Sequence, residues 1–186
     1  MNKILLVGLF FSAGLASISA QKFYTKTGNV SFFSRTTMEN IDAVTNTANC
    51  VLDMATGNIE MAVLIKSFIF PKALMQEHFN ENYMESTKFP KAIFKGTITN
   101  IKDFSMNMKG NFKGALVGSI TIHGVTKPIE NVVNLNPKDG KIAADLDFNV
   151  KLKDFEIEVP ALVKDNISRE IKVEVNTVLE EFKKAQ

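Results

Sequence analysis

Apolar and polar residues alternate with a period of two over most of this 186-residue chain. The run Ile59-Glu-Met-Ala-Val-Leu-Ile-Lys66 shows the pattern, which recurs over residues 146–152, 155–159 and 171–176. Such alternation is typical of strands that bury one face and expose the other. Because parallel sheets covered on both faces show continuous apolar runs instead, the chain is predicted to be all-β with an antiparallel sheet.

Turn signals separate the strand candidates. Thr56-Gly57-Asn58, Lys109-Gly110-Asn111 and Asp139-Gly140 each lie where a hairpin would reverse the chain. About eight or nine strand candidates fall between Phe23 and Val175. A β-sandwich and a closed barrel would each bury one face of such strands, so the alternation alone leaves both architectures open.

The first twenty residues have the pattern of an export signal. Lys3 precedes an apolar run from Ile4 to Phe11, and small residues continue to Ala20. This pattern predicts a cleavable secretory signal over residues 1–20, and the apolar run is shorter than the roughly 20 residues that a membrane anchor needs. Residues 21–186 are then expected to form one domain beyond the inner membrane of a bacterium, with no stable membrane anchor.

Charge and cysteine content narrow the possible partners. Only Lys3 of the 22 Lys and Arg residues lies in the predicted signal, which leaves 21 basic against 20 acidic residues and gives no electrostatic argument for a nucleic-acid partner. Cys50 is the only cysteine, so no intramolecular disulfide can form. Stability must therefore come from apolar packing, and the oligomeric state is not indicated.

Two segments, residues 78–98 and 116–129, resemble the YceI-like family. The resemblance implies a lipocalin-like antiparallel β-barrel of about eight strands in the periplasm, which binds a long apolar chain such as a polyisoprenoid. It therefore favours the barrel over the sandwich. The matching residues are Phe89, Pro90, Phe94, Gly118, Ile120, Gly124, Val125, Thr126 and Lys127.

One segment breaks the two-residue period. Met75, Phe79 and Tyr83 recur at every fourth position, which predicts an amphipathic helix over about residues 71–84. Pro71 suits the first helical position, and Pro90 discourages helical continuation. We expect the helix to cover the barrel or one open end. Residues 178–182 fit either the end of the last strand or a short helix.

The inward phase of the strands predicts an apolar ligand site. Each glycine on that phase, taken alone, is explained equally well by a cavity or by a bulge, a bend or a close backbone approach, and the case for a cavity rests on the glycines together with the YceI-like resemblance. An all-apolar lining would take up the chain of an isoprenoid or fatty-acyl lipid and offers no acid, base or charge partner. The predicted lining is Phe32, Met61, Val63, Phe94, Gly96, Ile98, Leu116, Gly118, Ile120, Ile122, Phe148 and Val150.

The scarcity of reactive side chains and catalytic motifs argues against an enzyme. His78 lies on the predicted helix, and the alternation places His123 on the outer face. The chain has no Gly-x-Ser-x-Gly motif, no phosphate-binding Gly-rich loop and no His-rich or Cys-rich spacing. The acidic run at residues 77, 81 and 85 is better explained as a solvated helix face than as a cation site. We therefore predict no catalytic residue, no metal and no cofactor.

Three function classes follow from these observations. The first is a periplasmic carrier that holds a lipid chain inside the barrel, and the second is a filled, ligand-free barrel that acts through its surface as an envelope stress-response or interaction module. The third is an enzyme that acts on such a lipid, and it would need polar groups inside the barrel, where the alternation shows almost none. Lys127 could meet an anionic head group at the barrel mouth, but an exposed lysine at a strand end is the favoured interpretation.

Overall fold

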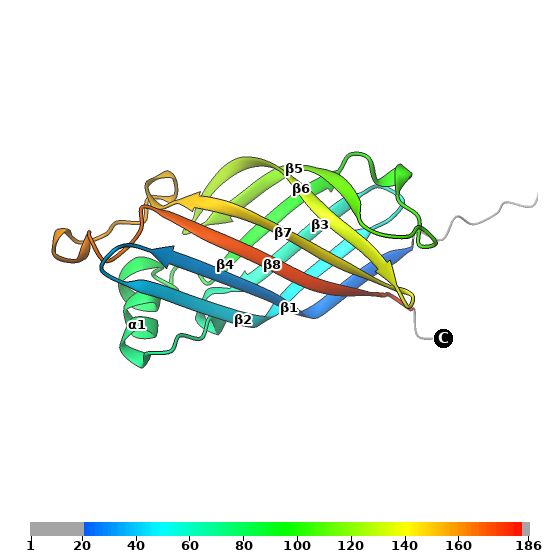
Figure 1. The fold of residues 1–186 in the computed structure, drawn as a ribbon. Coiled ribbons are helices and arrows are strands. Elements are labelled where there is room, and N and C mark those ends of the chain that lie inside the picture. The colour runs from blue at the N-terminus through cyan, green and yellow to red at the C-terminus, as the bar shows by residue number, and fades with distance from the viewer. Residues whose placement is uncertain (1–20, 184–186) are drawn as a thin grey trace, which may run out of the picture.

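The computed structural model describes residues 21–183, so the predicted export signal lies outside the described residues. These residues form an antiparallel barrel in which each strand pairs with the next along the chain, and β1 pairs with β8 (Figure 1). The strands are β1 (Lys22–Arg35), β2 (Asn40–Asp53), β3 (Asn58–Leu64), β4 (Lys91–Ile98), β5 (Phe112–Ile122), β6 (Val125–Lys138), β7 (Lys141–Lys151) and β8 (Glu170–Glu181).

The barrel confirms the predicted all-β, antiparallel, eight-stranded fold, because the pairing of β1 with β8 closes the sheet on itself. Closure removes the sheet edges that a sandwich would retain. The carboxyl-terminal segment, which fitted either a strand or a helix, belongs to β8.

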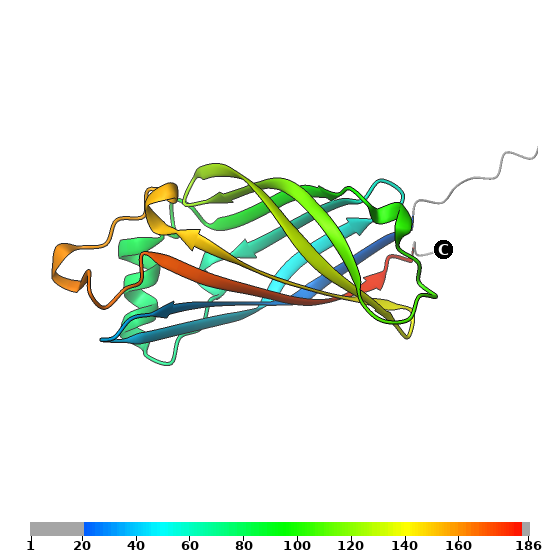
Figure 2. The same ribbon diagram turned by 45° about the horizontal axis from the view of Figure 1, so that its top comes forward.

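The helix predicted over about residues 71–84 is present. It consists of α1 (Ala73–His78), which continues without a break into one π-helical turn, η2 (Phe79–Tyr83). Pro71 precedes the helix instead of opening it, because Lys72 occupies the N-cap position. Figures 1 and 2 show the helix at one end of the barrel. The remaining helical turns are of the 3₁₀ type: η1 (Ile65–Ser67), η3 (Ile101–Asp103), η4 (Leu152–Phe155) and η5 (Ala161–Val163).

Two local predictions were wrong. Residues 155–159 were expected to form a strand, but η4 ends at Phe155 and Glu156 adopts a left-handed conformation with φ of 55°. This turn buries Phe155 and Ile157 without a strand, so burial at alternate positions mimicked the strand pattern. Gly110 was expected in a hairpin, but it lies in the long connection between β4 and β5, which contains η3.

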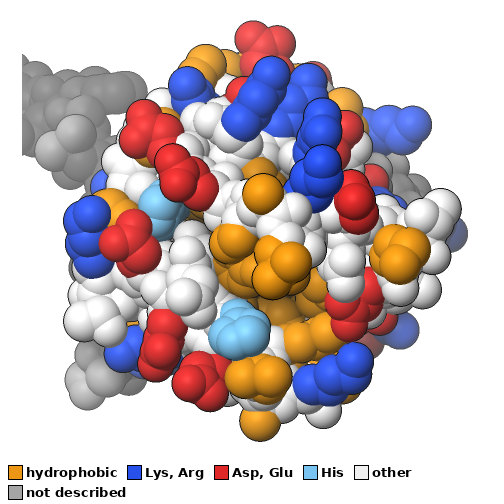
Figure 3. Space-filling model, turned by 90° about the vertical axis from the view of Figure 1, so that its left-hand side faces the viewer, with side chains coloured by type: hydrophobic (Ala, Val, Ile, Leu, Met, Phe, Trp, Pro, Cys, Tyr) orange, Lys and Arg blue, Asp and Glu red, His pale blue; other side chains and the backbone are white. Residues whose placement is uncertain are grey.

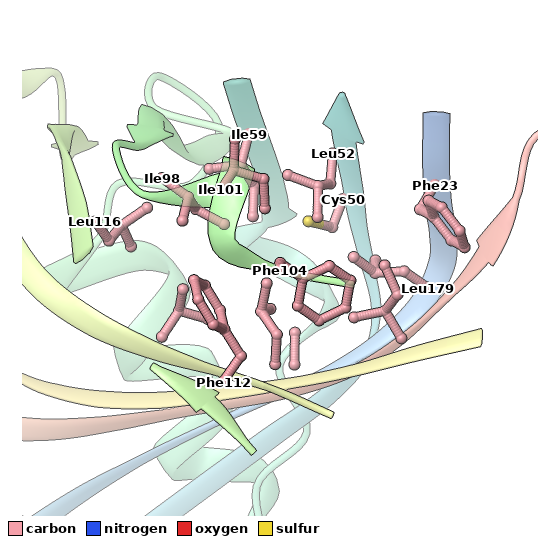
Figure 4. Packing of buried hydrophobic residues seen from close by; sticks show 14 residues of the cluster. Phe23, Cys50, Leu52, Ile59, Ile98, Ile101, Phe104, Phe112, Leu116 and Leu179 are labelled. Carbon is pink, nitrogen blue, oxygen red and sulfur yellow. The ribbon is translucent and has the colours of Figure 1, made fainter. Parts of the chain in front are cut away.

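One half of the barrel is filled by side chains. Phe23, Leu52, Ile98 and Leu179 are fully buried there and belong to a cluster of fourteen buried residues (Figure 4). The β4–β5 connection closes this end, because its residues Ile101 and Phe104 pack into the same cluster. Close packing of this kind leaves no room for a ligand, so any cavity must lie in the other half.

Cys50 is part of the filled half and is a free thiol. Burial raises the pKa of this thiol to about 12, because the thiolate would lose its hydration. Cys50 is therefore a small apolar packing residue in the folded protein and is not a nucleophile at neutral pH.

None of the helices within residues 21–183 is long and apolar enough to cross a bilayer.

Candidate ligand-binding cavity

The half of the barrel beside α1 encloses a cavity of ≈ 500 Å³. All eight strands contribute to its wall, and α1, η2 and the connection between β7 and β8 lie around its outer end. The filled core forms its floor, where Met61, Phe94 and Leu146 line the cavity and also pack against the buried cluster. The volume lies within the roughly 300–1,000 Å³ range of small-molecule sites.

Nine of the twelve predicted site residues line this cavity. They come from β1, β3, β4, β5 and β7, whose inward phase faces the space. These residues are Phe32, Met61, Val63, Phe94, Leu116, Ile120, Ile122, Phe148 and Val150.

Gly96, Ile98 and Gly118 do not line the cavity, which corrects the prediction for these three residues. Ile98 is fully buried in the filled core. Gly96 and Gly118 are directly paired across β4 and β5. A Cβ atom on Gly118 would lie 2.4 Å from the Lys95 carbonyl oxygen, and one on Gly96 would lie 2.5 Å from the Phe94 ring. These glycines therefore permit a close approach of two strands and do not widen the cavity.

Several lining residues were missed by the sequence-based prediction. Ile171, Val173 and Val175 alternate along β8, so the strand phase could have identified them. Phe68 and Phe70 also line the cavity, but they lie between η1 and α1, where no strand phase applies.

An aromatic cluster fixes the helix over the cavity. The ring centroid of Phe79 on η2 lies 5.3 Å from that of Phe32 on β1, 5.0 Å from that of Phe70 and 5.8 Å from that of Phe68. Offset and edge-to-face aromatic pairs at such distances are favourable beyond their burial alone. The π turn places Phe79 in this cluster, so the helix serves as a lid with an apolar inner face.

Polar groups gather at the outer end of the cavity. Glu39, in the β1–β2 turn, lies 3.5 Å from the Lys72 ammonium nitrogen and accepts a hydrogen bond from the Asn166 amide at 3.3 Å. All three residues line the cavity. Figure 3 shows apolar side chains receding between charged ones at this end, which is therefore the mouth of the cavity. Lys127 is exposed and does not line the cavity. The sequence did not predict these polar groups at the mouth, because they come from turns that are distant in the chain.

His123 was predicted to point outward, but its side chain is only 10% exposed. Its Nε2 atom lies 2.9 Å from a carboxylate oxygen of Glu85, just after η2, and its Nδ1 atom lies 3.2 Å from the Phe155 carbonyl oxygen. His123 and Gly124 have φ values of 52° and 78°, so the β5–β6 turn reverses the side-chain direction that a continuing strand would give. His123 thus ties the end of the lid helix to the barrel.

Replacing His123 with asparagine, which tolerates the left-handed backbone, is expected to loosen the lid. Loss of the contacts to Glu85 and Phe155 should cost about 1–2 kcal/mol of unfolding free energy, since Glu85 is partly exposed. Hydrogen exchange of residues 79–89 should accelerate more than exchange in β2 and β8, where it rises only through the lower unfolding free energy. The exposed Lys127→Ala substitution is the control, and unaltered exchange in the lid would contradict the role given to His123.

The cavity offers little chemistry beyond apolar contact. Its titratable lining residues are Glu39, Lys72, His78 and Tyr83. Burial raises the pKa of the Tyr83 phenol, so this group is neutral at physiological pH. Within residues 21–183, no group of three or more His, Cys, Asp or Glu side chains is placed to hold a metal ion. The arrangement suits an apolar chain inside and a polar group at the mouth.

The sequence matches the model of the YceI-like domain over residues 17–179. The chain belongs to the YceI-like family. No match was found among curated proteins. Three solved structures share this fold with the chain.

A polyisoprenoid-binding domain from Saccharophagus degradans, implicated in plant cell wall breakdown, is 13% identical with a TM-score of 0.73 and covers 87% of this chain and 98% of its own. BcnA of Burkholderia cenocepacia is 16% identical with a TM-score of 0.65, covering 82% of this chain and 95% of its own. The YCEI protein of Campylobacter jejuni is 18% identical with a TM-score of 0.53, covering 99% and 100%. At these identities the likeness establishes the fold.

The residues that carry the YceI-like resemblance have mainly architectural positions. The Phe89 ring lies 4.5 Å from the His123 ring, centroid to centroid, and occupies the space that a Cβ atom on Gly124 would need. The Pro90 carbonyl accepts a hydrogen bond from the Ile65 amide at 3.0 Å. Phe94 and Ile120 line the cavity. The motif thus anchors the lid to the barrel and contributes two residues to the wall.

Proposed function

We propose that this YceI-like barrel is a periplasmic carrier that holds the apolar chain of a polyisoprenoid or fatty-acyl lipid. The observation that carries the proposal is the ≈ 500 Å³ cavity, which has an apolar wall, a floor of packed side chains and polar groups at its mouth. A lipid has the matching division into an apolar chain and a polar head. The chain would enter the cavity, and the head would remain near Glu39, Lys72 and Asn166.

The hydrophobic effect would drive such binding. Each methylene group removed from water contributes about 0.8 kcal/mol, so about ten buried methylenes would contribute roughly 8 kcal/mol before the loss of chain and rigid-body freedom is subtracted. Within the apolar part of the cavity, contacts of this kind depend on the length and shape of a chain more than on its chemical identity. A carrier with some tolerance among isoprenoid and acyl chains is therefore expected.

The family and a protein of the same fold support this proposal. The Saccharophagus degradans domain, which shares the fold, is a polyisoprenoid-binding domain. The export pattern of residues 1–20 and the family resemblance support a periplasmic location. A filled barrel acting only through its surface would have little internal volume, and the cavity disfavours that alternative. The apolar wall likewise disfavours an enzyme.

Native mass spectrometry of the protein purified from its own host tests the proposal. We expect a complex of one protein with one lipid, and solvent extraction should identify a prenyl or long-chain acyl species. After delipidation, the protein should regain mass when prenyl alcohols or fatty acids are added. Protein that is bare when purified and that also refuses both lipid classes would overturn the carrier function.

A further inference from the structure

We propose that the mouth of the barrel docks on the surface of a zwitterionic lipid bilayer, so that a lipid chain passes directly between the bilayer and the cavity. The inference rests on the proposed function, and it adds the place where the carrier is loaded. The partner of this surface is the bilayer itself.

The mouth carries exposed apolar side chains on three separate turns. Met38 in the β1–β2 turn is 70% exposed, Leu74 in the first turn of α1 is 61% exposed, and Leu162 in η5 is 95% exposed. We refer to these three residues as the apolar rim. Their position at one end of the barrel, beside the opening of an apolar cavity, is what sets them apart from singly scattered apolar side chains, which need no explanation.

The bonds at the mouth place the three turns together. Glu39 follows Met38 in the chain, and it contacts both Lys72 at the start of α1 and Asn166 in the β7–β8 connection. Leu74 and Val163, the residue after Leu162, line the cavity. The apolar rim therefore surrounds the opening through which a ligand would pass, and Figure 3 shows separate apolar groups at this end, interspersed with charged ones.

The outer wall of the barrel differs from the mouth. Val51, Val117, Val132 and Val178 are its exposed valines, but each is only about half exposed, at 45–52%, and lies within a strand. Scattered exposed apolar residues are normal on a protein surface. At the mouth, by contrast, side chains that are 61–95% exposed project from turns around an opening into an apolar cavity.

The charges at the mouth indicate the kind of surface. Lys72 is paired with Glu39, and Lys164 is followed directly by Asp165. Recognition of anionic lipid relies on clusters of four to eight Lys and Arg residues. Residues 151–170, at the same end of the barrel, hold four basic residues, Lys151, Lys153, Lys164 and Arg169, but also five acidic ones, Asp154, Glu156, Glu158, Asp165 and Glu170, so this part of the mouth carries no excess of positive charge. This charge balance agrees better with insertion of the apolar rim into the interface of a zwitterionic bilayer, as apolar side chains of interfacial helices insert.

The nature of the cargo also favours a bilayer over a protein partner. A long apolar chain enters water at a cost that grows with every methylene group, so it resides in membranes and crosses water slowly. A carrier whose opening touches the bilayer spares the chain that passage. An apolar rim that projects around the opening achieves this contact.

Flotation with phosphatidylcholine vesicles tests the proposal. The protein should float with the vesicles, and the double variant Met38→Glu with Leu162→Glu should reduce binding at least about tenfold, because both side chains are exposed and would carry charge into the interface. Binding of the unaltered protein should change little between about 0.05 and 0.5 M salt, since it does not depend on long-range charge. Val132→Glu on the outer wall is the matched control and should bind normally.

A second readout separates docking from lipid binding. The double variant should accept a fluorescent fatty acid from detergent micelles as well as the unaltered protein does, because neither substituted residue lines the cavity, but its uptake from vesicles should slow at least about tenfold. Normal uptake from vesicles by the double variant would overturn docking and leave the carrier intact. Failure of the unaltered protein to take lipid from either source would overturn the carrier function itself. A dimer that only the double variant dissociates, with no vesicle binding, would assign the rim to a second copy of the chain and overturn the bilayer.

Discussion

Replacing Gly118 with alanine is expected to cost at least about 3 kcal/mol of unfolding free energy and to lower Tm by about 6–12 °C. The added Cβ atom would lie 2.4 Å from the Lys95 carbonyl oxygen and 2.6 Å from the Gly96 Cα atom. Both are backbone atoms of the paired strand, so they cannot move aside without separating β4 from β5. Thermal or urea unfolding followed by circular dichroism measures the effect.

Gly114→Ala is the matched control on the same strand. Its added Cβ atom would lie 2.8 Å from the Ile98 Cγ2 atom and 3.0 Å from the Val133 Cγ1 atom. Side chains adjust more readily than backbone, so this change should cost about 1 kcal/mol. If Gly118→Ala instead left Tm unchanged or higher, as a gain in chain stiffness alone would predict, the close approach of the two strands would be wrong.

Filling the cavity floor is expected to remove the binding of long chains without unfolding the protein. Met61 and Leu146 line the cavity and also pack against the filled core. Tryptophan at both positions would project into the ≈ 500 Å³ cavity and shorten it. The affinity for long prenyl and acyl chains should fall at least about a hundredfold, whereas shorter chains should be affected less. Calorimetric titration with a chain-length series measures this shift.

Two further measurements keep this prediction open to contradiction. Met61→Leu conserves volume and should leave affinity and Tm nearly unchanged. The double tryptophan variant should keep Tm within a few degrees, because the new rings enter empty space. A large fall in Tm would mean that the floor is already overpacked and that no usable cavity lies above it.

The strand phase explains why much of the site could be predicted from the sequence. Side-chain direction in a strand alternates strictly, so Phe94, Ile120 and Phe148 could be placed on the cavity wall from local pattern alone. The same phase led to the prediction that Gly96 and Gly118 line the cavity, but their role depends on their direct pairing. That pairing joins residues far apart in the chain, and the local pattern does not contain it.

The lid helix was predicted, but the contacts that form the mouth and hold the lid to the barrel were not, for a related reason. The ion pair of Glu39 with Lys72 and the bond from Asn166 join three turns that only the closed barrel brings together. His123 departed from its predicted outward direction because it adopts a left-handed backbone in the β5–β6 turn, where strand phase ends. Features that arise at turns or from long-range contact thus need the structure.

Photolabelling with a lipid that carries a diazirine at the far end of its chain tests the central claim most directly. If the chain occupies the cavity with its head at the mouth, the label should attach to floor residues, namely Met61, Phe94, Leu116 or Leu146. An excess of unlabelled lipid should compete the labelling away. Labelling confined to outer-wall residues such as Val117 or Val132, with none on the floor, would contradict a lipid-filled barrel.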